Sequence, residues 1–293
     1  MPINNSNELP VWVNRAITET LEKQRNGLET GVVSSGFYDL DQMSEGLRPG
    51  DLIIVAGSPQ MGKTALALNI AEHIAFKESK TAVFTSVDLS SEQLALRTVC
   101  SIGRISLQNM HAGKPTADEH RRLKDALGTL ALGRLHIDMY EDLSISAIRD
   151  LASMYSKKCG NLGLVVVDYL QRLSSNEHGP ITVFEIAETL RQLKALANEF
   201  HCPVIALSQL PPRVEMRRNK RPVLTDLGRI EPIRKYVDTV ILLYRDEVYT
   251  KDNCPEPGLV DVVFPLRRDG SYGETRLVFL NQIAKFESLA CQA

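Results

Sequence analysis

A glycine-rich loop between an apolar segment and a helical pattern constrains this chain more than any other feature of its sequence. The apolar residues 52–56 lead directly into the loop, and the helical pattern ALALNIAEHIAF follows it. The loop reads Gly57-Ser58-Pro59-Gln60-Met61-Gly62-Lys63-Thr64, which is G-x-x-x-x-G-K-[ST] in a strand–loop–helix setting. Its glycines let successive backbone amides face one anion, and the helix adds its positive N-terminal end. Residues 57–64, called the phosphate loop below, are therefore predicted to bind a nucleoside triphosphate.

Three polar residues supply the rest of the expected site. The motif predicts that Lys63 reaches the β- and γ-phosphates and that the Thr64 hydroxyl binds Mg²⁺. The apolar residues 164–167 deliver Asp168 to the end of an expected strand. In enzymes with such a loop, an aspartate in this place orders the magnesium through water. The expected cofactors are therefore ATP and Mg²⁺.

Composition and charge exclude several classes of protein. With 293 residues, 43% of them hydrophobic, the chain is long enough for one large α/β domain and a small appendage. A net charge of -2 argues against coating nucleic acid by bulk electrostatics, although a few DNA-contacting loops stay compatible with it. The scattered cysteines indicate reduced thiols rather than disulfides or a zinc site. We expect neither a signal peptide nor a membrane span, and hence a cytoplasmic protein.

Apolar runs alternate with helical patterns, which predicts an α/β fold with a mainly parallel, twisted sheet flanked by helices. The expected strands are residues 52–56, 82–85, 135–138, 164–167, 203–207 and 239–244. An apolar stripe at positions 186, 190, 193 and 197 predicts a helix that faces the core. Near the C-terminus, Asp269-Gly270 separates two apolar segments, 260–264 and 276–280, and predicts an antiparallel hairpin at the edge of the sheet.

The N-terminal segment differs in character from the rest of the chain. Residues 1–30 are predicted to form a flexible N-terminus with a short amphipathic helix at about residues 10–25, since Val13, Ile17 and Leu21 recur every four residues. Residues 31–293 are predicted to form the nucleotide-binding domain. A short helix cannot bury its apolar stripe alone, so it folds back on its own domain or docks on a neighbour.

Four segments of the sequence resemble the motor domain of DnaB-type replicative helicases. They are SGFYDLDQMSEGLRPGDLIIVAGSPQMGKTALALNIA, VVVDYLQRL, EIAETLRQLKALANEFHCPVIALSQL and LYRDEVY, within residues 31–286. The resemblance implies a RecA-like fold, a ring of six subunits with ATP at each boundary, and 5′–3′ translocation on single-stranded DNA. It also implies that the family's N-terminal collar domain is lacking, and it leaves room for a replication protein as a partner. Residues 10–25 match the linker helix that docks on an adjacent subunit in this family.

The resemblance also assigns catalytic roles. Gln209 resembles the residue that senses the γ-phosphate, and Asp88 occupies the place of the glutamate that activates the attacking water. An aspartate is shorter by one methylene group, so we expect slowed rather than abolished hydrolysis. Arg268 matches an arginine finger offered to the neighbour's γ-phosphate. The family places a lysine two residues before it, where this chain has Leu266.

The expected DNA-facing loop, residues 226–238, departs most from the family pattern. Its length is preserved, but the Arg-Glu-x-Gly set that meets the phosphate backbone is absent, and Pro232 removes an amide donor. Arg229, Arg234 and Lys235 are the candidate DNA-binding residues, because sequence-independent strand binding needs positive charge more than particular bases. A further basic stretch, residues 213–221, is either a solvated loop or lies near the subunit boundary or the DNA channel.

Two functions from different classes stay open at the level of sequence. The first is an ATP-hydrolysing hexameric helicase motor. The second is a helicase-like regulator or assembly factor that binds ATP and a partner without unwinding DNA. The phosphate loop, Asp168, Gln209 and Arg268 favour continuing nucleotide chemistry. Asp88, Leu266 and the altered 226–238 loop favour the regulator. A recombinase-like filament former is the weakest alternative, since the resemblance is to the helicase branch throughout.

Overall fold

The computed structural model describes residues 31–87, 89–131, 133–140, 143–160, 162–173 and 183–289, without the side chains of 183–185. The chain divides into two compact units, residues 1–32 and 33–293, and the second unit carries the features below. The helix expected at about residues 10–25 lies outside the described residues. The predicted division of the chain at residue 30 therefore stays a prediction.

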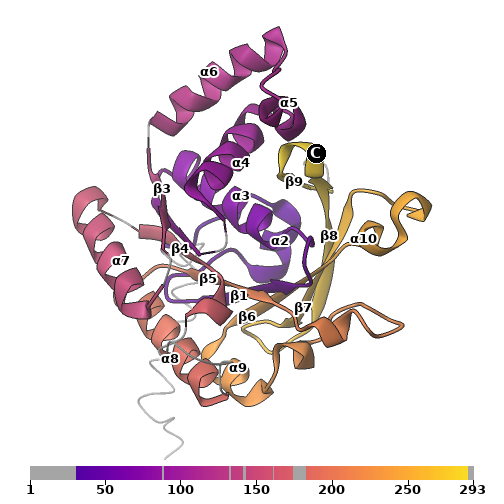
Figure 1. Cartoon of the computed structure of the whole chain (residues 1–293). Helices are drawn as coiled ribbons and strands as arrows, with labels where there is room; N and C mark the ends of the chain where they lie inside the picture. Colours follow the sequence, from indigo (N-terminus) through magenta and orange to yellow (C-terminus); the bar gives the residue numbers. More distant parts are fainter. Residues whose placement is uncertain are drawn as a thin grey trace, which may run out of the picture. The chain divides into compact units, whose positions relative to one another are not determined.

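One sheet forms the centre of the second unit. In the described part of the chain it has nine strands, in the order β3-β2-β4-β5-β1-β6-β7-β8-β9 (Figure 1). The strands are β1 (Leu52–Gly57), β2 (Thr81–Ser86), β3 (Leu135–Met139), β4 (Leu162–Asp168), β5 (Val204–Gln209), β6 (Thr239–Tyr244), β7 (Leu259–Leu266), β8 (Gly273–Leu280) and β9 (Lys285–Ser288). From β3 to β6 neighbours are parallel, and from β6 to β9 they are antiparallel. The predicted α/β fold with a parallel core and a C-terminal antiparallel hairpin is confirmed.

The hairpin does not lie at the edge of the sheet, contrary to the prediction. We expected β7 and β8 to end the sheet, but β9 pairs with β8 and forms that edge. The strand is only four residues long and reads KFES, so it lacks the apolar run that marks the other strands. Its one fully buried side chain, Phe286, stacks on Phe279 of β8 at 4.4 Å between ring centroids. Packing against the sheet, rather than local sequence, makes this segment a strand.

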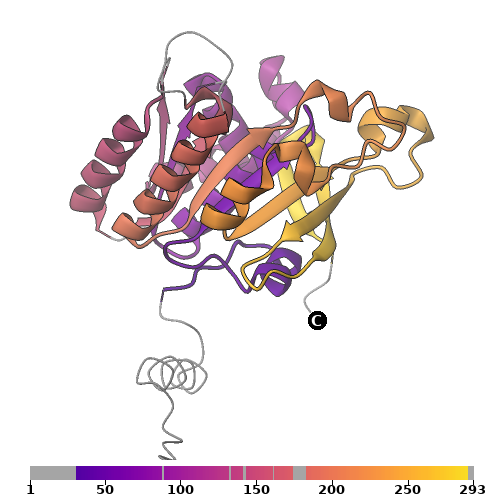
Figure 2. The same cartoon turned by 90° about the horizontal axis from the view of Figure 1, so that it is seen from below.

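Helices cover both faces of the parallel strands (Figure 2). Those that pack on one face are α2 (Tyr38–Ser44), α3 (Lys63–Phe76) and α4 (Ser91–Gly103). Those on the other face are α7 (Ile145–Cys159), α8 (Val183–Phe200) and α9 (Ile230–Tyr236). The remaining helices are α5 (Leu107–His111), α6 (Ala117–Ala131) and the short α10 (Glu247–Thr250). Within the described ranges, no helix combines the length and apolar character that crossing a bilayer requires.

Burial on both faces explains why the parallel strands read as continuous apolar runs. In β4, Leu164 and Val166 join the cluster under α3, while Val165 and Val167 join the cluster under α7 and α8. The stripe predicted in α8 behaves as expected, since Leu190, Leu193 and Ala197 are fully buried and Ile186 packs against them.

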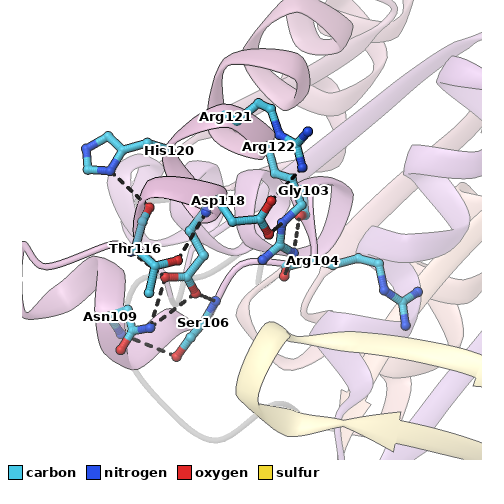
Figure 3. A network of polar contacts seen from close by, with 10 residues as sticks. Gly103, Arg104, Ser106, Asn109, Thr116, Asp118, His120, Arg121 and Arg122 are labelled. Carbon is cyan, nitrogen blue, oxygen red and sulfur yellow. Dashed lines mark hydrogen bonds and ion pairs between the residues drawn. The ribbon is translucent and has the colours of Figure 1, made fainter.

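Helices α4, α5 and α6 form an appendage with a small apolar cluster of its own, around Cys100 and Ile105. The carboxylate of Glu119 in α6 accepts hydrogen bonds from the backbone N–H groups of Thr116 (2.8 Å) and Ser106 (3.1 Å) and from the Asn109 amide (Figure 3). These bonds, led by the one from Thr116, lower the pKa of Glu119 to about 2. One carboxylate thus holds together the starts of α5 and α6. Ser90 and Gln93 form a capping box at the start of α4.

A buried polar network attaches α4 and β9 to the helix that follows the phosphate loop. Glu72 of α3 accepts the Ser101 hydroxyl at 2.7 Å, and the backbone N–H of Phe286 donates to Asn69 Oδ1 at 2.7 Å. Glu72 is buried, and one of its carboxyl oxygens, Oε1, has no hydrogen-bond partner. Burial raises the pKa of Glu72 to about 8, against an ordinary value of 4.5. The folded chain therefore holds this carboxyl in its neutral form near neutral pH.

Because of Glu72, the free energy of unfolding should decrease as pH rises toward about 8. The folded chain keeps a proton that the unfolded chain releases, so this contribution is full below pH 4.5 and is lost as pH rises through about 8. We expect the free energy of unfolding of the wild-type chain to fall by an amount on the order of a few kcal/mol between about pH 6 and about pH 9. This fall should be absent in Glu72→Gln. Thermal unfolding across this range measures it. Glu199→Gln, at an exposed position of α8, should show the same dependence of stability on pH as the wild type. If Glu72→Gln also shows the wild-type dependence, Glu72 is not its source.

Candidate functional site

The phosphate loop joins the carboxyl end of β1 to the start of α3. Ser58 and Met61 are buried, whereas Pro59 and Gln60 are exposed. No side chain caps the first turn of α3, and that turn carries no acidic residue. No side chain of the first turn therefore competes with an anion for the backbone N–H groups at the start of this 14-residue helix. This arrangement suits an anion such as a phosphate group.

Two positions in the loop leave little room for a side chain, for different reasons. A Cβ at Gly57 would lie 3.0 Å from the Leu243 carbonyl oxygen, because the loop passes close to strand β6. Gly62 has a φ of 92°, and its Cβ would lie 2.8 Å from Phe286 of β9. The curl of the loop is therefore fixed by strands that follow it much later in the chain.

The Lys63 ammonium is folded against its own loop. It donates to the carbonyl oxygens of Gly57 and Ser58, both at 2.9 Å. A flexible side chain held at the mouth of the loop can exchange these carbonyls for phosphate oxygens without moving the backbone. The position agrees with the role predicted for Lys63, which stays a prediction.

The side chains of Thr64 and Asp168 are in contact at the carboxyl ends of the parallel strands. The Thr64 hydroxyl donates to Asp168 Oδ2 at 3.1 Å, although the two residues belong to α3 and to the end of β4. Strand β5 lies between β4 and β1, so the parallel order brings their carboxyl ends to one edge. A hydroxyl and a carboxylate, both hard oxygen donors, suit Mg²⁺ when water completes its coordination. The residues present therefore fit the metal predicted from sequence.

The predicted sensor, Gln209, ends β5 at the same edge, and its side chain is exposed. A residue that the sequence analysis did not select holds it in place. Gln171, just after β4, donates through Nε2 to the Ser208 hydroxyl (2.8 Å) and to the Gln209 carbonyl oxygen (2.9 Å). Its Oε1 accepts the Gln209 N–H at 3.3 Å. One side-chain amide thus continues the contact between β4 and β5 past their last paired residues, Val167 and Ala206.

Arg245 is the second residue that sequence reasoning missed. It follows β6, is 6% exposed, and donates from Nη1 to the Gln60 carbonyl oxygen of the phosphate loop at 2.7 Å. Its guanidinium lies 4.6 Å from the Phe279 ring centroid and pairs with Glu247. The segment LYRDEVY pointed to the family resemblance, but a buried arginine behind the loop has no signature in one sequence.

The predicted water-activating residue, Asp88, lies outside the described residues, so its role stays a prediction. The chain next to it is described. Ser86 pairs in register with Asp168, and the Val87 N–H donates to the Asp168 carbonyl oxygen at 3.1 Å. Val87 therefore lies next to the end of β4.

Arg268 lies at the opposite end of the sheet from the phosphate loop. Its Nη1 donates to Asp51 Oδ1 at 2.9 Å, and Asp51 directly precedes β1, whereas the loop follows β1. A strand of six residues spans on the order of 17 Å, far longer than an arginine side chain. Arg268 therefore cannot reach the phosphate loop of its own chain. Leu266 pairs with Val240 and packs on the core, so it offers no charge at this place.

The candidate DNA-binding residues lie on and beside a helix rather than on an open loop. Arg229 is the N-cap of α9, and Arg234 and Lys235 lie in its last turn, all three exposed. They therefore occupy opposite ends of the helix and form no single cluster. Pro232 is the third residue of α9, where a backbone N–H has no partner within the helix, so the proline costs no helical hydrogen bond.

The basic stretch 213–221 is partly tied to its own chain. Arg217 makes two hydrogen bonds to the buried carboxylate of Asp226, at 2.8 and 3.0 Å. Arg221 pairs with Asp261 and lies over the Tyr244 ring. Arg221 thereby contacts β6 and β7, while both arginine side chains stay partly exposed, so a solvated loop and a place near the subunit boundary or the DNA channel both stay open for this stretch.

Comparisons with known proteins agree with this geometry. The family model for the DnaB-like helicase C terminal domain matches residues 31–288. The replicative DNA helicase DnaB of Geobacillus stearothermophilus is 38% identical over 266 residues, which cover 90% of this chain and 58% of that protein. The chain thus spans about three fifths of the length of this curated relative.

Two solved structures are similar over nearly the whole chain. One is an ATPase domain with a TM-score of 0.85 and 27% identity, and the match covers 96% of this chain and all of that one. The other, a DnaB-like replicative helicase described with its interactions with primase, has a TM-score of 0.86 and 28% identity, with 98% and 69% covered. The predicted RecA-like fold is confirmed.

Gln171 gives a test of how the site is held together. We expect Gln171→Ala to speed amide hydrogen exchange at Gln209 by roughly 5- to 10-fold, because a hydrogen bond worth about 1 kcal/mol is lost. Exchange measured by NMR or on a peptide covering residues 204–212 reads this out. Gln108→Ala, at an exposed position of α5, is the matched control. Unchanged protection at Gln209 would show that the side-chain amide does not hold the strand end.

Proposed function

Because this chain belongs to the DnaB-like helicase C-terminal domain family, we propose that it is the ATP-hydrolysing motor of a hexameric helicase. Hydrolysis would be coupled to translocation on single-stranded DNA, in the 5′–3′ direction that the resemblance implies. ATP and Mg²⁺ are the proposed cofactors. The observation that carries the proposal is the hydrogen bond between Thr64 and Asp168 beside an uncapped helix start, since it joins both halves of a magnesium–triphosphate site.

The residues of the site divide the work of hydrolysis. The loop amides and Lys63 bind the β- and γ-phosphates, and Thr64 and Asp168 hold the metal, the latter through water. When held by these residues, the metal would supply positive charge against the charge that develops on the transferred phosphoryl group. Asp88 accepts a proton from the attacking water, and Gln209 contacts the γ-phosphate region from the end of β5. Gln171 holds the Gln209 backbone in place, and Arg245 holds the backbone of the phosphate loop.

Arg268 completes the site of a neighbouring subunit. Its place at the amino end of β1 supports action in trans, because the phosphate loop of its own chain lies at the other end of that strand. An arginine that enters the neighbour's site stabilises charge on the γ-phosphate, an effect worth roughly 10³- to 10⁵-fold in other enzymes. The same geometry supports head-to-tail association, in which each subunit offers one end of its sheet to the next.

Arg229, Arg234 and Lys235 are proposed to contact the DNA backbone, because all three are exposed and no base-specific recognition is required. Their separation along α9 favours contact with successive phosphates over a single phosphate. A replication protein is a proposed partner.

A regulator without unwinding activity is the second candidate, and Leu266 is the observation that favours it. Where the family resemblance places a lysine, this leucine packs on the core, so only one of the two expected cations remains. ATP turnover measured with and without single-stranded DNA separates the two candidates. DNA-stimulated turnover by a ring supports the motor, and ATP binding without stimulation supports the regulator.

Subunit mixing tests the shared site. We expect Lys63→Ala to abolish ATP binding and Arg268→Ala to lower turnover by at least about 100-fold with ATP binding retained. A mixture of the two variants should regain part of the activity, because some boundaries then combine an intact loop with an intact finger. Steady-state ATP turnover across mixing ratios measures it. No recovery at any ratio, with mixed assembly verified by mass, would contradict a site shared between subunits.

Asp88 is tested by lengthening its side chain. We expect Asp88→Glu to raise ATP turnover by roughly 10- to 100-fold, because the longer side chain brings the carboxylate about 1 Å closer to the attacking water. Nucleotide affinity should stay unchanged. Asp125→Glu, on the exposed part of α6, controls for the added methylene group. Turnover that does not change would contradict the role of Asp88 in hydrolysis.

A further inference from the structure

Asp51 is a buried carboxylate that contacts the outward-facing Arg268. The Asp51 side chain is 7% exposed and that of Arg268 is 53% exposed, and 2.9 Å separates their Oδ1 and Nη1 atoms. The backbone of Asp51 is fixed on both sides, because its N–H donates to the Arg48 carbonyl oxygen and its carbonyl oxygen accepts the Val204 N–H. The carboxylate is thus a rigid support, and the arginine is the movable partner.

The turn that carries Arg268 is held by the preceding arginine. Arg267 donates from Nη1 to the Met43 carbonyl oxygen (3.1 Å), from Nε to the Ser271 hydroxyl (2.7 Å) and from Nη2 to Asp269 (3.1 Å). These contacts fix the backbone between β7 and β8. They also occupy Arg267, which leaves Arg268 as the arginine of this pair that faces outward. The remaining freedom at Arg268 lies in its own side chain.

The other charged groups near Asp51 attract its carboxylate less than Arg268 does, or repel it. Asp238 faces it and is paired with Lys194, whose Nζ lies 2.6 Å from Asp238 Oδ2. Burial, followed by the charge of Asp238, raises the pKa of Asp51 to about 6, while Arg268, Lys194 and Arg48 oppose this in that order. The largest attraction on the Asp51 carboxylate therefore comes from Arg268.

We propose that Asp51 is the positioning residue for Arg268, holding one edge of its guanidinium while the other N–H groups face the triphosphate of the neighbouring subunit. The proposal rests on the proposed function, in which Arg268 acts in trans. A guanidinium has five N–H donors in a fixed plane, so a contact at Nη1 leaves donors for phosphate oxygens. A long side chain that is already oriented loses less conformational entropy when the subunits meet.

The test is the substitution Asp51→Asn in the full chain. The asparagine side chain keeps the size of the aspartate but cannot hold a charge. We expect ATP turnover to fall about 10-fold, as when supporting partners of catalytic groups are removed elsewhere, with unchanged nucleotide affinity. The melting temperature should stay equal or rise, because a buried ionised carboxylate is replaced by a neutral amide. Asp118→Asn, which breaks an exposed aspartate–arginine pair on α6, should keep wild-type turnover.

Combining the substitution with Arg268→Ala separates positioning from a structural effect. If Asp51 acts through Arg268, then Asp51→Asn lowers turnover in the wild-type background and has no further effect in Arg268→Ala. An equal loss in both backgrounds would overturn the proposal. If Arg268→Ala itself keeps wild-type turnover, the shared site of the proposed function fails. If Arg268→Ala lowers turnover and Asp51→Asn does not, only the positioning role fails.

The unsubstituted chain gives an independent reading, even if Asp51→Asn does not fold. Protonation of Asp51 as pH falls through about 6 removes the charge that holds Arg268. The ratio of wild-type to Arg268→Ala turnover should therefore fall by about 10-fold between roughly pH 7.5 and roughly pH 5. A ratio that stays constant over this range would overturn the proposal.

Discussion

The hydrogen bond between Thr64 and Asp168 joins two segments that lie 104 residues apart, and the rest of the site depends on it. It forms only if β1 and β4 run parallel and end at the same edge of the sheet. That in turn requires both faces of the strands to be covered, because a parallel sheet has no solvated face. The apolar runs, the helices on each face and the oxygen pair at the edge are therefore consequences of one arrangement.

The two ends of β1 have different tasks. The carboxyl end continues into the phosphate loop, with Gln209 and Asp168 beside it. The amino end carries Asp51 and, through it, Arg268. With Arg268 acting in trans as proposed, subunits would associate head to tail, and such contacts close into a ring or continue as a filament.

Much of the fold could be predicted from the sequence, because apolar runs such as residues 164–167 identify buried parallel strands. The phosphate loop was also evident, since its glycines, lysine and threonine are adjacent in sequence. Strand β9 escaped prediction because its four residues are shaped by packing on β8. Gln171 and Arg245 escaped it as well, since each acts on the backbone of a segment brought near only by folding. Arg268 was identified by resemblance, but its contact with Asp51, 217 residues away, could not be inferred.

The contact of Phe286 with the loop and with α3 has a consequence for how the protein is made. Gly62 lies against the Phe286 ring, and Asn69 accepts the Phe286 N–H across 217 residues of sequence. A nascent chain on the ribosome thus exposes the loop long before the strand that packs on it has been translated. A chain that ends before residue 286 would therefore lack the ring that packs on Gly62 and the N–H group that donates to Asn69.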